Sequence, residues 1–450
     1  MKMKFNISLA LLLGLSISLT SCFKNDQDDI FDQSASERLE QVKKDYTNIL
    51  TSNGGKWELQ YFANSDNEGY DYLMTFKKDG TVQMSGYNSA IGEYNTGVSS
   101  AQYGTESSLW EVLTDNGPVL SFNSYNSVFH IFADPADIGS TTTNEAGRGY
   151  EGDYEFDLMK YSNDTIYLEG KKHGLSMIMT RVDSTVNDET FLNEVIELKN
   201  NLFSPKIPRI YLTLPEGNRY VISGGSDGVI SYFPEGSDSI VTTESANCIV
   251  SHGGLAFLEP LKIEGHNIQN FVLDTDGGLL CTDDNKSKID AGNLAGVLLH
   301  KSLSWTLNLT GGKYSTLIEN LKTDISTRMK NFSYSSFRVY HSSTRKGVTG
   351  DFYAIEIGLT YKSSGKVRTT KPLYEFTPVI GADGTLSFTD VHASNVDNAA
   401  TYLTTFPALQ DLLDAIAGDK FKLSAISNLA PTAIKLVSDT NSEDELNFSL

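Results

Sequence analysis

The chain has 450 residues and a formal net charge of −21 at pH 7, with 57 Asp and Glu residues against 36 Lys and Arg residues. The basic residues are scattered rather than clustered, so a chain this acidic would be repelled by nucleic acid and by anionic membrane surfaces. The composition therefore predicts no nucleic-acid partner. The length allows two or three domains.

The first 22 residues have the pattern of an export signal. Lys2 and Lys4 precede an apolar run over 9–15, and Leu19-Thr20-Ser21 leads to Cys22. This pattern predicts a cleaved lipoprotein signal peptide over 1–21 and acylation of Cys22, which would anchor the chain in a lipid bilayer. The apolar run is shorter than the roughly 20 residues that a membrane span needs. An ordinary cleaved signal peptide with an incidental cysteine is the alternative.

Residues 22–33 are rich in Asp and predict a solvated acidic tether, rather than a metal site, between the anchor and the first domain. A helix is expected next, because Ser34 and Glu37 form a capping box and apolar residues from Leu39 to Leu50 recur on one face. Asn53-Gly54-Gly55 predicts its end.

From Trp57 onward, apolar and polar residues alternate as they do in strands. Asp79-Gly80 predicts a tight hairpin turn, because glycine readily adopts the positive φ that such a turn needs. We expect an antiparallel meander, closing into a barrel or sandwich, over residues 34–184. The further strands expected there are 108–113, 119–122, 127–132, 154–161, 165–169 and 175–182.

A second helix is predicted over 188–200 and marks a domain boundary near residue 185. A mixed α+β domain is expected over 185–450, and a further split near 310 is the alternative. Two more helices are predicted there, over 313–330 and from Pro407 to a stop at Gly418. The fold class predicted for the whole chain is mainly β, of the α+β type. The strands expected in the second domain are 209–214, 220–223, 228–232, 256–263, 268–273, 332–340, 352–361, 373–379, 385–388, 421–426, 433–437 and 446–450.

Cys248 and Cys281 are the cysteines that follow Cys22. They could form a disulfide, since an exported chain meets an oxidising compartment. We favour the alternative that they are two small buried hydrophobic residues on neighbouring strands. Two cysteines without closely spaced histidines do not make a zinc site.

The sequence predicts no catalytic residues, no metal and no cofactor, since it contains neither a His-Glu-x-x-His helix nor a Gly-x-Ser-x-Gly elbow. His130 and Asp134 lie four residues apart on a predicted strand, so both would point to one face. They could be a base with its orienting carboxylate, or two metal ligands. We favour a satisfied polar pair at the end of a sheet.

Two glycine-containing segments resemble ligand loops. Asp274-Thr275-Asp276-Gly277 resembles the start of a calcium loop, but the twelfth position is Asn285 rather than Glu, so a tight turn is favoured. The segment 224–228 could cradle a phosphate, but no helix is predicted after it, so we expect a hairpin loop.

Aromatic residues in the first domain are candidate ligand contacts. Trp57, Tyr61 and Tyr72 could stack on sugar rings if they lay on an exposed sheet face. Most aromatic residues in alternating strands are core residues, and that is the general expectation.

Several short runs in the first domain resemble a family of Bacteroidota lipoproteins, domain of unknown function family 4302. The resemblance is specific over residues 20–183. In this chain Gly55-Lys56-Trp57 has one residue more than the family's usual Gly-Trp, and Asn123 stands where Asp is usual. The runs that carry the resemblance are 30–39, 70–76, 120–125, 130–135, 152–156 and 164–170.

This resemblance implies an outer-membrane lipoprotein encoded beside nutrient-import proteins, and it implies no known activity. An acidic stretch after the lipid cysteine, like Asp26 to Asp29, implies display on the cell exterior. The position of Gly55-x-Trp57 after a helix also resembles the first strand of lipocalin-like barrels. Three Asp-Ser/Thr motifs match the O-glycosylation pattern of this phylum, although chance also produces such matches. The candidate acceptors are Thr165, Ser184 and Ser239.

From these observations we expect a non-enzymatic surface lipoprotein that binds a glycan or a peptide as an accessory to nutrient-import outer-membrane proteins. A hydrolase with an unrecognised site is one alternative. A structural or adhesive envelope protein is another.

Overall fold

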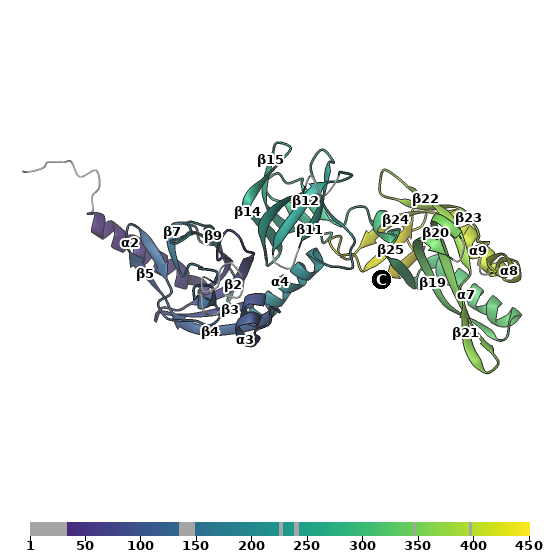
Figure 1. Cartoon of the computed structure of the whole chain (residues 1–450), viewed down its shortest axis with the longest axis horizontal. Helices are drawn as coiled ribbons and strands as arrows, with labels where there is room; N and C mark the ends of the chain where they lie inside the picture. Colours follow the sequence, from purple (N-terminus) through teal and green to yellow (C-terminus); the bar gives the residue numbers. More distant parts are fainter. Residues whose placement is uncertain (1–33, 135–148, 225–227, 238–242, 346–347, 396–397) are drawn as a thin grey trace, which may run out of the picture.

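The computed structural model describes residues 34–134, 149–224, 228–237, 243–345, 348–395 and 398–450. The chain forms three antiparallel β units that lie in a row (Figure 1). We call them the first sheet, the barrel and the third sheet. The predicted tether, the signal peptide and Cys22 lie outside the described residues.

The first sheet is a nine-stranded antiparallel sheet with the order β4-β3-β2-β1-β9-β8-β7-β6-β5. Its chain runs as two meanders that meet where β1 pairs with β9. The strands are β1 (Lys56–Phe62), β2 (Gly69–Phe76), β3 (Thr81–Asn88), β4 (Gln102–Leu109), β5 (Glu111–Thr114), β6 (Pro118–Ser121), β7 (Glu155–Tyr161), β8 (Thr165–Gly170) and β9 (Ser176–Arg181).

Helix α2 (Ala35–Thr51) precedes the first sheet and lies at the outer end of the row (Figure 1). The predicted capping box is confirmed: the Ser34 hydroxyl accepts a hydrogen bond from the Glu37 N–H, and the Glu37 carboxylate accepts one from the Ser34 N–H. Two further short helices contact this sheet, and η1 (Ser52–Gly54) links α2 to β1. The contacting helices are α3 (Ser89–Thr96) and η2 (His130–Phe132).

The barrel is a closed antiparallel barrel of eight strands, and helix α4 (Asp188–Leu202) leads into it. Its interior is apolar, and α4 contributes Val195, Leu198 and Leu202 to the same core. The strands are β10 (Ile210–Thr213), β11 (Arg219–Gly224), β12 (Val229–Pro234), β13 (Glu244–Ser251), β14 (Gly254–Ile263), β15 (His266–Leu273), β16 (Leu279–Cys281) and β17 (Lys288–Asp290).

The third sheet has nine strands, and helices α7 (Gly312–Arg328) and α9 (Pro407–Ala417) pack together beside it. Its core is continuous with that of the barrel, whereas most of the first sheet has a core of its own. The short helices are α6 (Leu294–Leu298) and α8 (Ala399–Thr405). The strands are β18 (Ser304–Thr310), β19 (Phe332–Arg345), β20 (Val348–Ser363), β21 (Lys366–Thr370), β22 (Leu373–Ile380), β23 (Leu386–Ala393), β24 (Lys420–Ala425), β25 (Ala433–Ser438) and β26 (Glu445–Ser449).

The mainly β fold class is confirmed. The expected boundary near residue 185 falls between β9 and α4, and the alternative split near 310 falls at the end of β18. The Asp79-Gly80 hairpin is confirmed, because Gly80 has φ +85° and lies between the paired strands β2 and β3. The strand predicted over 127–132 is wrong: His130–Phe132 is a short 3-10 helix whose residues are buried.

The two later cysteines are buried in the barrel and neither forms a disulfide. They are not on neighbouring strands, because β14 and β15 lie between Cys248 on β13 and Cys281 on β16. Burial raises the pKa of Cys281 to about 11. Both behave as small hydrophobic residues of the core.

Candidate functional site

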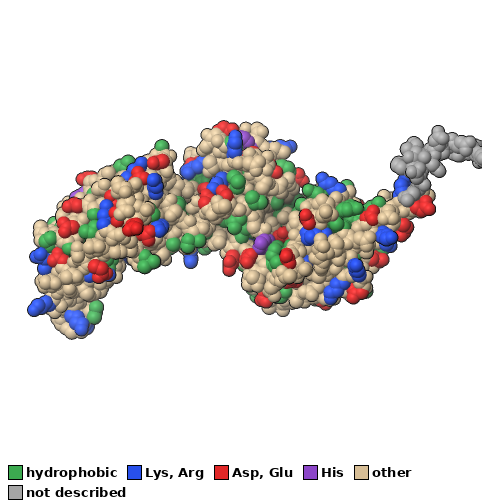
Figure 2. Space-filling view, turned by 180° about the vertical axis from the view of Figure 1, so that it is seen from behind, with side chains coloured by type: hydrophobic (Ala, Val, Ile, Leu, Met, Phe, Trp, Pro, Cys, Tyr) green, Lys and Arg blue, Asp and Glu red, His purple; other side chains and the backbone are tan. Residues whose placement is uncertain are grey.

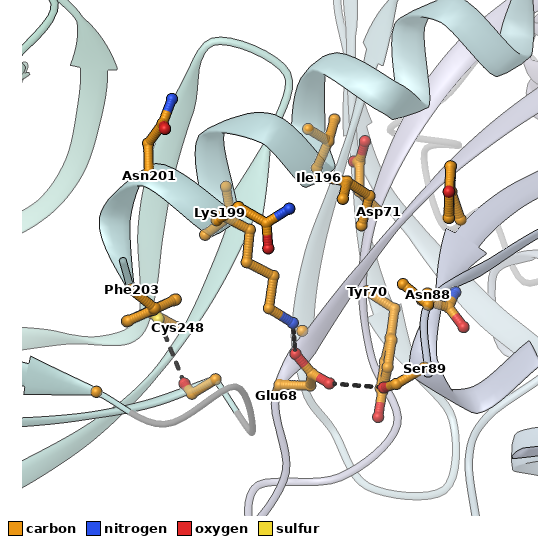
Figure 3. A pocket seen from close by; sticks show the side chains of 18 of the residues that line it. Glu68, Tyr70, Asp71, Asn88, Ser89, Ile196, Lys199, Asn201, Phe203 and Cys248 are labelled. Atoms are coloured by element: carbon orange, nitrogen blue, oxygen red, sulfur yellow. Dashed lines mark hydrogen bonds and ion pairs between the residues drawn. The ribbon is translucent and has the colours of Figure 1, made fainter. Parts of the chain in front are cut away.

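A cavity of about 930 Å³ lies where the first sheet, helix α4 and the barrel meet (Figure 3). We call it the junction cavity. Its wall combines residues far apart in the sequence. The lining residues include Asn67, Glu68, Tyr70, Asp71, Tyr87, Ser89, Tyr150, Ile196, Lys199, Asn200, Asn201, Phe203, Ser204, Lys206 and Cys248.

Helix α4 joins the two units that enclose this cavity. Asn187 caps the helix, and its side-chain oxygen accepts a hydrogen bond from the Thr190 N–H at 2.9 Å. Phe191 and Leu192 pack with Leu73 of β2, whereas the apolar residues of the last turns belong to the barrel core. One amphipathic helix therefore holds the first sheet and the barrel together, and its remaining surface lines the cavity.

Glycines allow the barrel to approach the first sheet closely. A Cβ at Gly69 would lie 2.4 Å from the Cβ of Ile249. A Cβ at Gly228, whose φ is +71°, would lie 2.0 Å from the Cβ of Glu68. The backbones meet because neither position carries a side chain.

A buried carboxylate in the cavity wall is neutralised from the helix. Lys199 reaches from α4 to form an ion pair with Glu68, and the Ser89 hydroxyl donates to the other Glu68 oxygen at 3.3 Å (Figure 3). Tyr70 lies beside this pair, and burial, with Glu68 adding to it, raises its pKa well above the ordinary value. The charges of this wall therefore cancel locally.

Asp71 also lines the cavity, but neither of its carboxyl oxygens is reached by solvent or by a hydrogen-bond donor. Burial is the main reason that the pKa of Asp71 is raised well above its ordinary value, and Glu58 beside it raises the pKa further. Asp71 is therefore held as the neutral acid.

Lys206 is the other charged residue of the lining and is exposed, and the rest of the lining is uncharged and includes aromatic rings. Asn200 and Asn201 are exposed at the end of α4, and Asn67 adds a third amide. Tyr87, Tyr150 and Phe203 are half-buried. Amides, hydroxyls and half-buried rings are the groups that bind neutral polar ligands.

The aromatic residues that the sequence suggested as ligand contacts do not line the cavity but lie in the core. Trp57, Tyr61 and Tyr72 are at most 1 % exposed. Their polar atoms donate to the backbone carbonyls of Leu50, Asp153 and Val128. They are closed to a ligand in this structure, and the sequence missed this because it does not say which face of the sheet is covered.

His130 and Asp134 do not form a pair on a strand. His130 begins the short helix η2, where its Nδ1 accepts from the Asn126 N–H at 3.0 Å and its Nε2 donates to the Phe122 carbonyl at 3.1 Å. Burial lowers its pKa. Asp134 is exposed, and its N–H donates to the His130 carbonyl at 3.1 Å. His130 is thus a satisfied structural histidine.

The O-glycosylation candidates lie outside the cavity. Thr165 is half-buried at the start of β8, and Ser184 is exposed between β9 and α4. Ser239 lies outside the described residues.

No group of three or more His, Cys, Asp or Glu side chains in the described part of the chain is arranged to hold a metal. The segment from Asp274 is a tight turn, as expected, and Lys288 pairs there with Asp274 at 3.2 Å. The loop over 224–228 joins the paired strands β11 and β12, although 225–227 lie outside the described residues. Within the described ranges, no helix is both long and apolar enough to cross a membrane.

The cavity residues on α3 and α4 were not predicted from the sequence. Asn88 caps α3, and Gly97 ends it with φ +72°, which is a recognisable pair of helix signals. Helix α4 was predicted, but only as a boundary. No local pattern shows that Ile196, Lys199 and Asn201 face residues more than 100 positions earlier.

No curated protein matches the chain. Among solved structures, it is similar to an uncharacterised protein from Bacteroides eggerthii, at 15% identity over 28% of this chain and 97% of that one, with a TM-score of 0.17. Another is the beta subunit of DNA polymerase from Streptococcus pyogenes, at 11% identity over 89% and 91% of the two chains, with a TM-score of 0.12. TM-scores this low support no argument about this chain.

The model of the family described as "Domain of unknown function (DUF4302)" matches residues 27–275. The match covers more than half of the chain. It includes the first sheet and α4 and extends into the barrel, so it contains most of the residues that line the junction cavity. The chain belongs to the DUF4302 family.

Proposed function

We propose that this protein is a non-enzymatic binding protein that holds a glycan or a peptide segment in the junction cavity. The observation that carries the proposal is the cavity itself, about 930 Å³ in volume and lined by amides, hydroxyls and half-buried rings. Its volume lies in the upper part of the range of ligand sites, roughly 300–1,000 Å³.

The charges of the wall favour a neutral ligand. Glu68 is paired with Lys199, and Asp71 is held as the neutral acid. Lys206, the other charged residue of the lining, is exposed. A charged ligand held among the buried residues of the wall would lose its hydration without gaining a counter-charge there, which is costly. Sugar hydroxyls and peptide amides find matching partners in Asn200, Asn201 and Ser204.

Binding is favoured over catalysis because the described lining residues include no histidine and no activated nucleophile. The Asp71 and Glu58 carboxyl pair would be the natural candidate for a hydrolase, but both Asp71 oxygens are closed to solvent. A general acid must reach the reacting group directly or through one water. A structural or adhesive role has no feature of its own in its favour.

The cellular setting is part of the proposal. We infer a lipid anchor at Cys22 in the outer membrane of a member of the Bacteroidota, exposure to the cell exterior, and a role as an accessory to nutrient-import proteins. The sequence pattern at 1–22 and the acidic tether support this. Helix α2, which follows the tether, lies at the outer end of the row, so a tether there would hold the junction cavity away from the membrane (Figure 1).

The surface is compatible with this setting. On the face drawn in Figure 2, acidic and basic side chains are interspersed, and no broad basic patch is visible. Such a surface neither attracts nucleic acid nor adheres to an anionic membrane.

The test is a binding screen followed by a cavity-filling variant. The full chain is screened on an array of oligosaccharides and peptides, and the strongest hit is titrated by calorimetry. Ile196→Trp places a large ring in the cavity and is expected to weaken binding at least tenfold. Asn193→Trp on the exposed face of the same helix is the matched control and should bind like the wild type.

An array without hits contradicts the proposal, and so does a hit that Ile196→Trp leaves unchanged. Cleavage of the hit during the titration would show that the protein is a hydrolase rather than a binding protein.

A further inference from the structure

We propose that Glu58 and Asp71 share one proton, and that this proton holds the barrel against the first sheet. Loss of the proton at alkaline pH would loosen the junction and open the cavity. If the cavity holds a ligand, this opening would release it, and that part of the inference rests on the proposed function. The shared proton and the loosening of the junction do not depend on the proposed function.

The two carboxyls lie on one face of the first sheet. Glu58 of β1 is opposite Leu73 of β2, and Gln60 is opposite Asp71, so Glu58 and Asp71 are diagonal neighbours. Both residues are buried, at 7% and 6% exposure. This face is covered by α4 and by the end of β13, and Gln60 donates across the junction to the Ser251 hydroxyl at 3.2 Å.

Glu58 has donors, and Asp71 has none. One Glu58 oxygen accepts from the His252 N–H at 2.8 Å, and the other accepts from the Thr180 hydroxyl at 3.0 Å. The His252 bond spans the junction, because His252 lies in the turn after β13. Both Asp71 oxygens are without a donor. A buried carboxyl in this position is stable only if it carries a proton, and Glu58 is the acceptor beside it.

Lys56 and Lys199, the lysines of β1 and α4 at the junction, are already paired with other groups. Lys56 of β1 bonds to Asp188 at 2.7 Å and to the Val186 carbonyl at 2.6 Å. Lys199 of α4 pairs with Glu68.

His252 also lies at the junction. Its Nε2 lies 2.6 Å from the Glu194 carboxylate of α4, and its ring stacks on Phe191 at 4.0 Å. The side chains of Lys56, Lys199 and His252 are thus each engaged by a carboxylate other than Glu58 or Asp71. Ionised Asp71 and Glu58 would repel each other in a site that excludes water.

The repulsion between ionised Glu58 and Asp71 would be relieved by a movement of the barrel segment that covers them. Movement of the β13–β14 turn away from Glu58 would admit water to both carboxylates, and hydration would replace the lost hydrogen bond. The same movement would expose Cys248, which is 1% exposed and lines the cavity. Cys281 is 0% exposed inside the barrel and does not line the cavity, so it is an internal control.

The experiment is a pulse of N-ethylmaleimide on the ligand-free full chain between pH 5 and pH 10, read for each cysteine by peptide mass spectrometry. Asp71→Asn is the comparison, because its amide donates to Glu58 as the protonated acid does and cannot ionise. Thiol ionisation depends on pH in both proteins and cancels in the ratio of their labelling rates at Cys248.

We expect the Cys248 labelling rate of the wild type, divided by that of Asp71→Asn, to be near one at low pH and to rise at least tenfold at alkaline pH. Labelling of Cys281 should not differ between the two proteins. A ratio that stays near one overturns the proposal, as does alkaline opening of Asp71→Asn, which would assign the change to a group other than Asp71.

Glu58→Gln is the second variant, and it keeps the test decisive if Asp71→Asn does not fold. Its side-chain oxygen still accepts from the His252 N–H, and it carries no charge to repel Asp71. We expect no alkaline opening, and opening like that of the wild type would overturn the proposal. Since no ligand is present, an array without hits leaves this result standing.

Discussion

At the scale of single residues, the junction depends on polar groups that are buried together. Lys56, Ser85 and Asp188 form one set, in which Asp188 accepts from Lys56 at 2.7 Å and from the Ser85 hydroxyl at 2.7 Å. Glu58 and Asp71 form the other. Hydrogen bonds within the first set satisfy its polar groups, whereas the second set needs a proton because Asp71 has no hydrogen-bond donor. This difference makes the stability of the junction depend on pH.

Asp71→Asn should change how stability depends on pH. The unfolded wild type loses the Asp71 proton near pH 4, whereas the folded protein keeps it to a much higher pH, because burial raises the pKa of Asp71. The contribution of Asp71 to stability therefore falls as pH rises from about 4 to the folded pKa. We expect the stability of Asp71→Asn relative to the wild type to increase steadily over this range, as measured by hydrogen exchange at β1 and β2. A difference that is constant with pH would show that Asp71 is ionised in both states.

At the scale of elements, much of the fold could be predicted from local signals. The Ser34 capping box, the Asp79-Gly80 turn and Pro407 at the start of α9 each satisfy a backbone requirement within a few residues. Local signals do not show which face of a strand is buried, because this depends on the elements that cover each face of the sheet. For this reason Tyr61 and Tyr72 were candidates for ligand contact although they lie in the core.

Helix α4 is the element on which the cavity depends most. Asn187→Ala removes the cap from the Thr190 N–H and should destabilise the helix by about 1 kcal/mol. Hydrogen exchange at the first turns of α4 measures this loss. Asn187→Asp retains a capping oxygen and is the control. Equal exchange in Asn187→Ala and the wild type would mean that packing of Phe191 and Leu192 alone fixes the start of the helix.

At the scale of the whole molecule, the cavity exists because two β units approach each other at Gly69 and Gly228. Neither unit alone would contain it. The family match covers the first sheet, α4 and part of the barrel, so it includes both walls. The third sheet shares the barrel's core and extends the row away from α2 (Figure 1). A ligand in the cavity would therefore bridge the units and resist their separation.

The most direct test is hydrogen exchange of the full chain with and without the strongest ligand from the array. Protection is predicted to rise together in three segments: 67–71 at the start of β2, 196–204 at the end of α4, and 248–250 on β13. Protection confined to one unit, or to the third sheet, would contradict the claim that the ligand lies in the junction cavity.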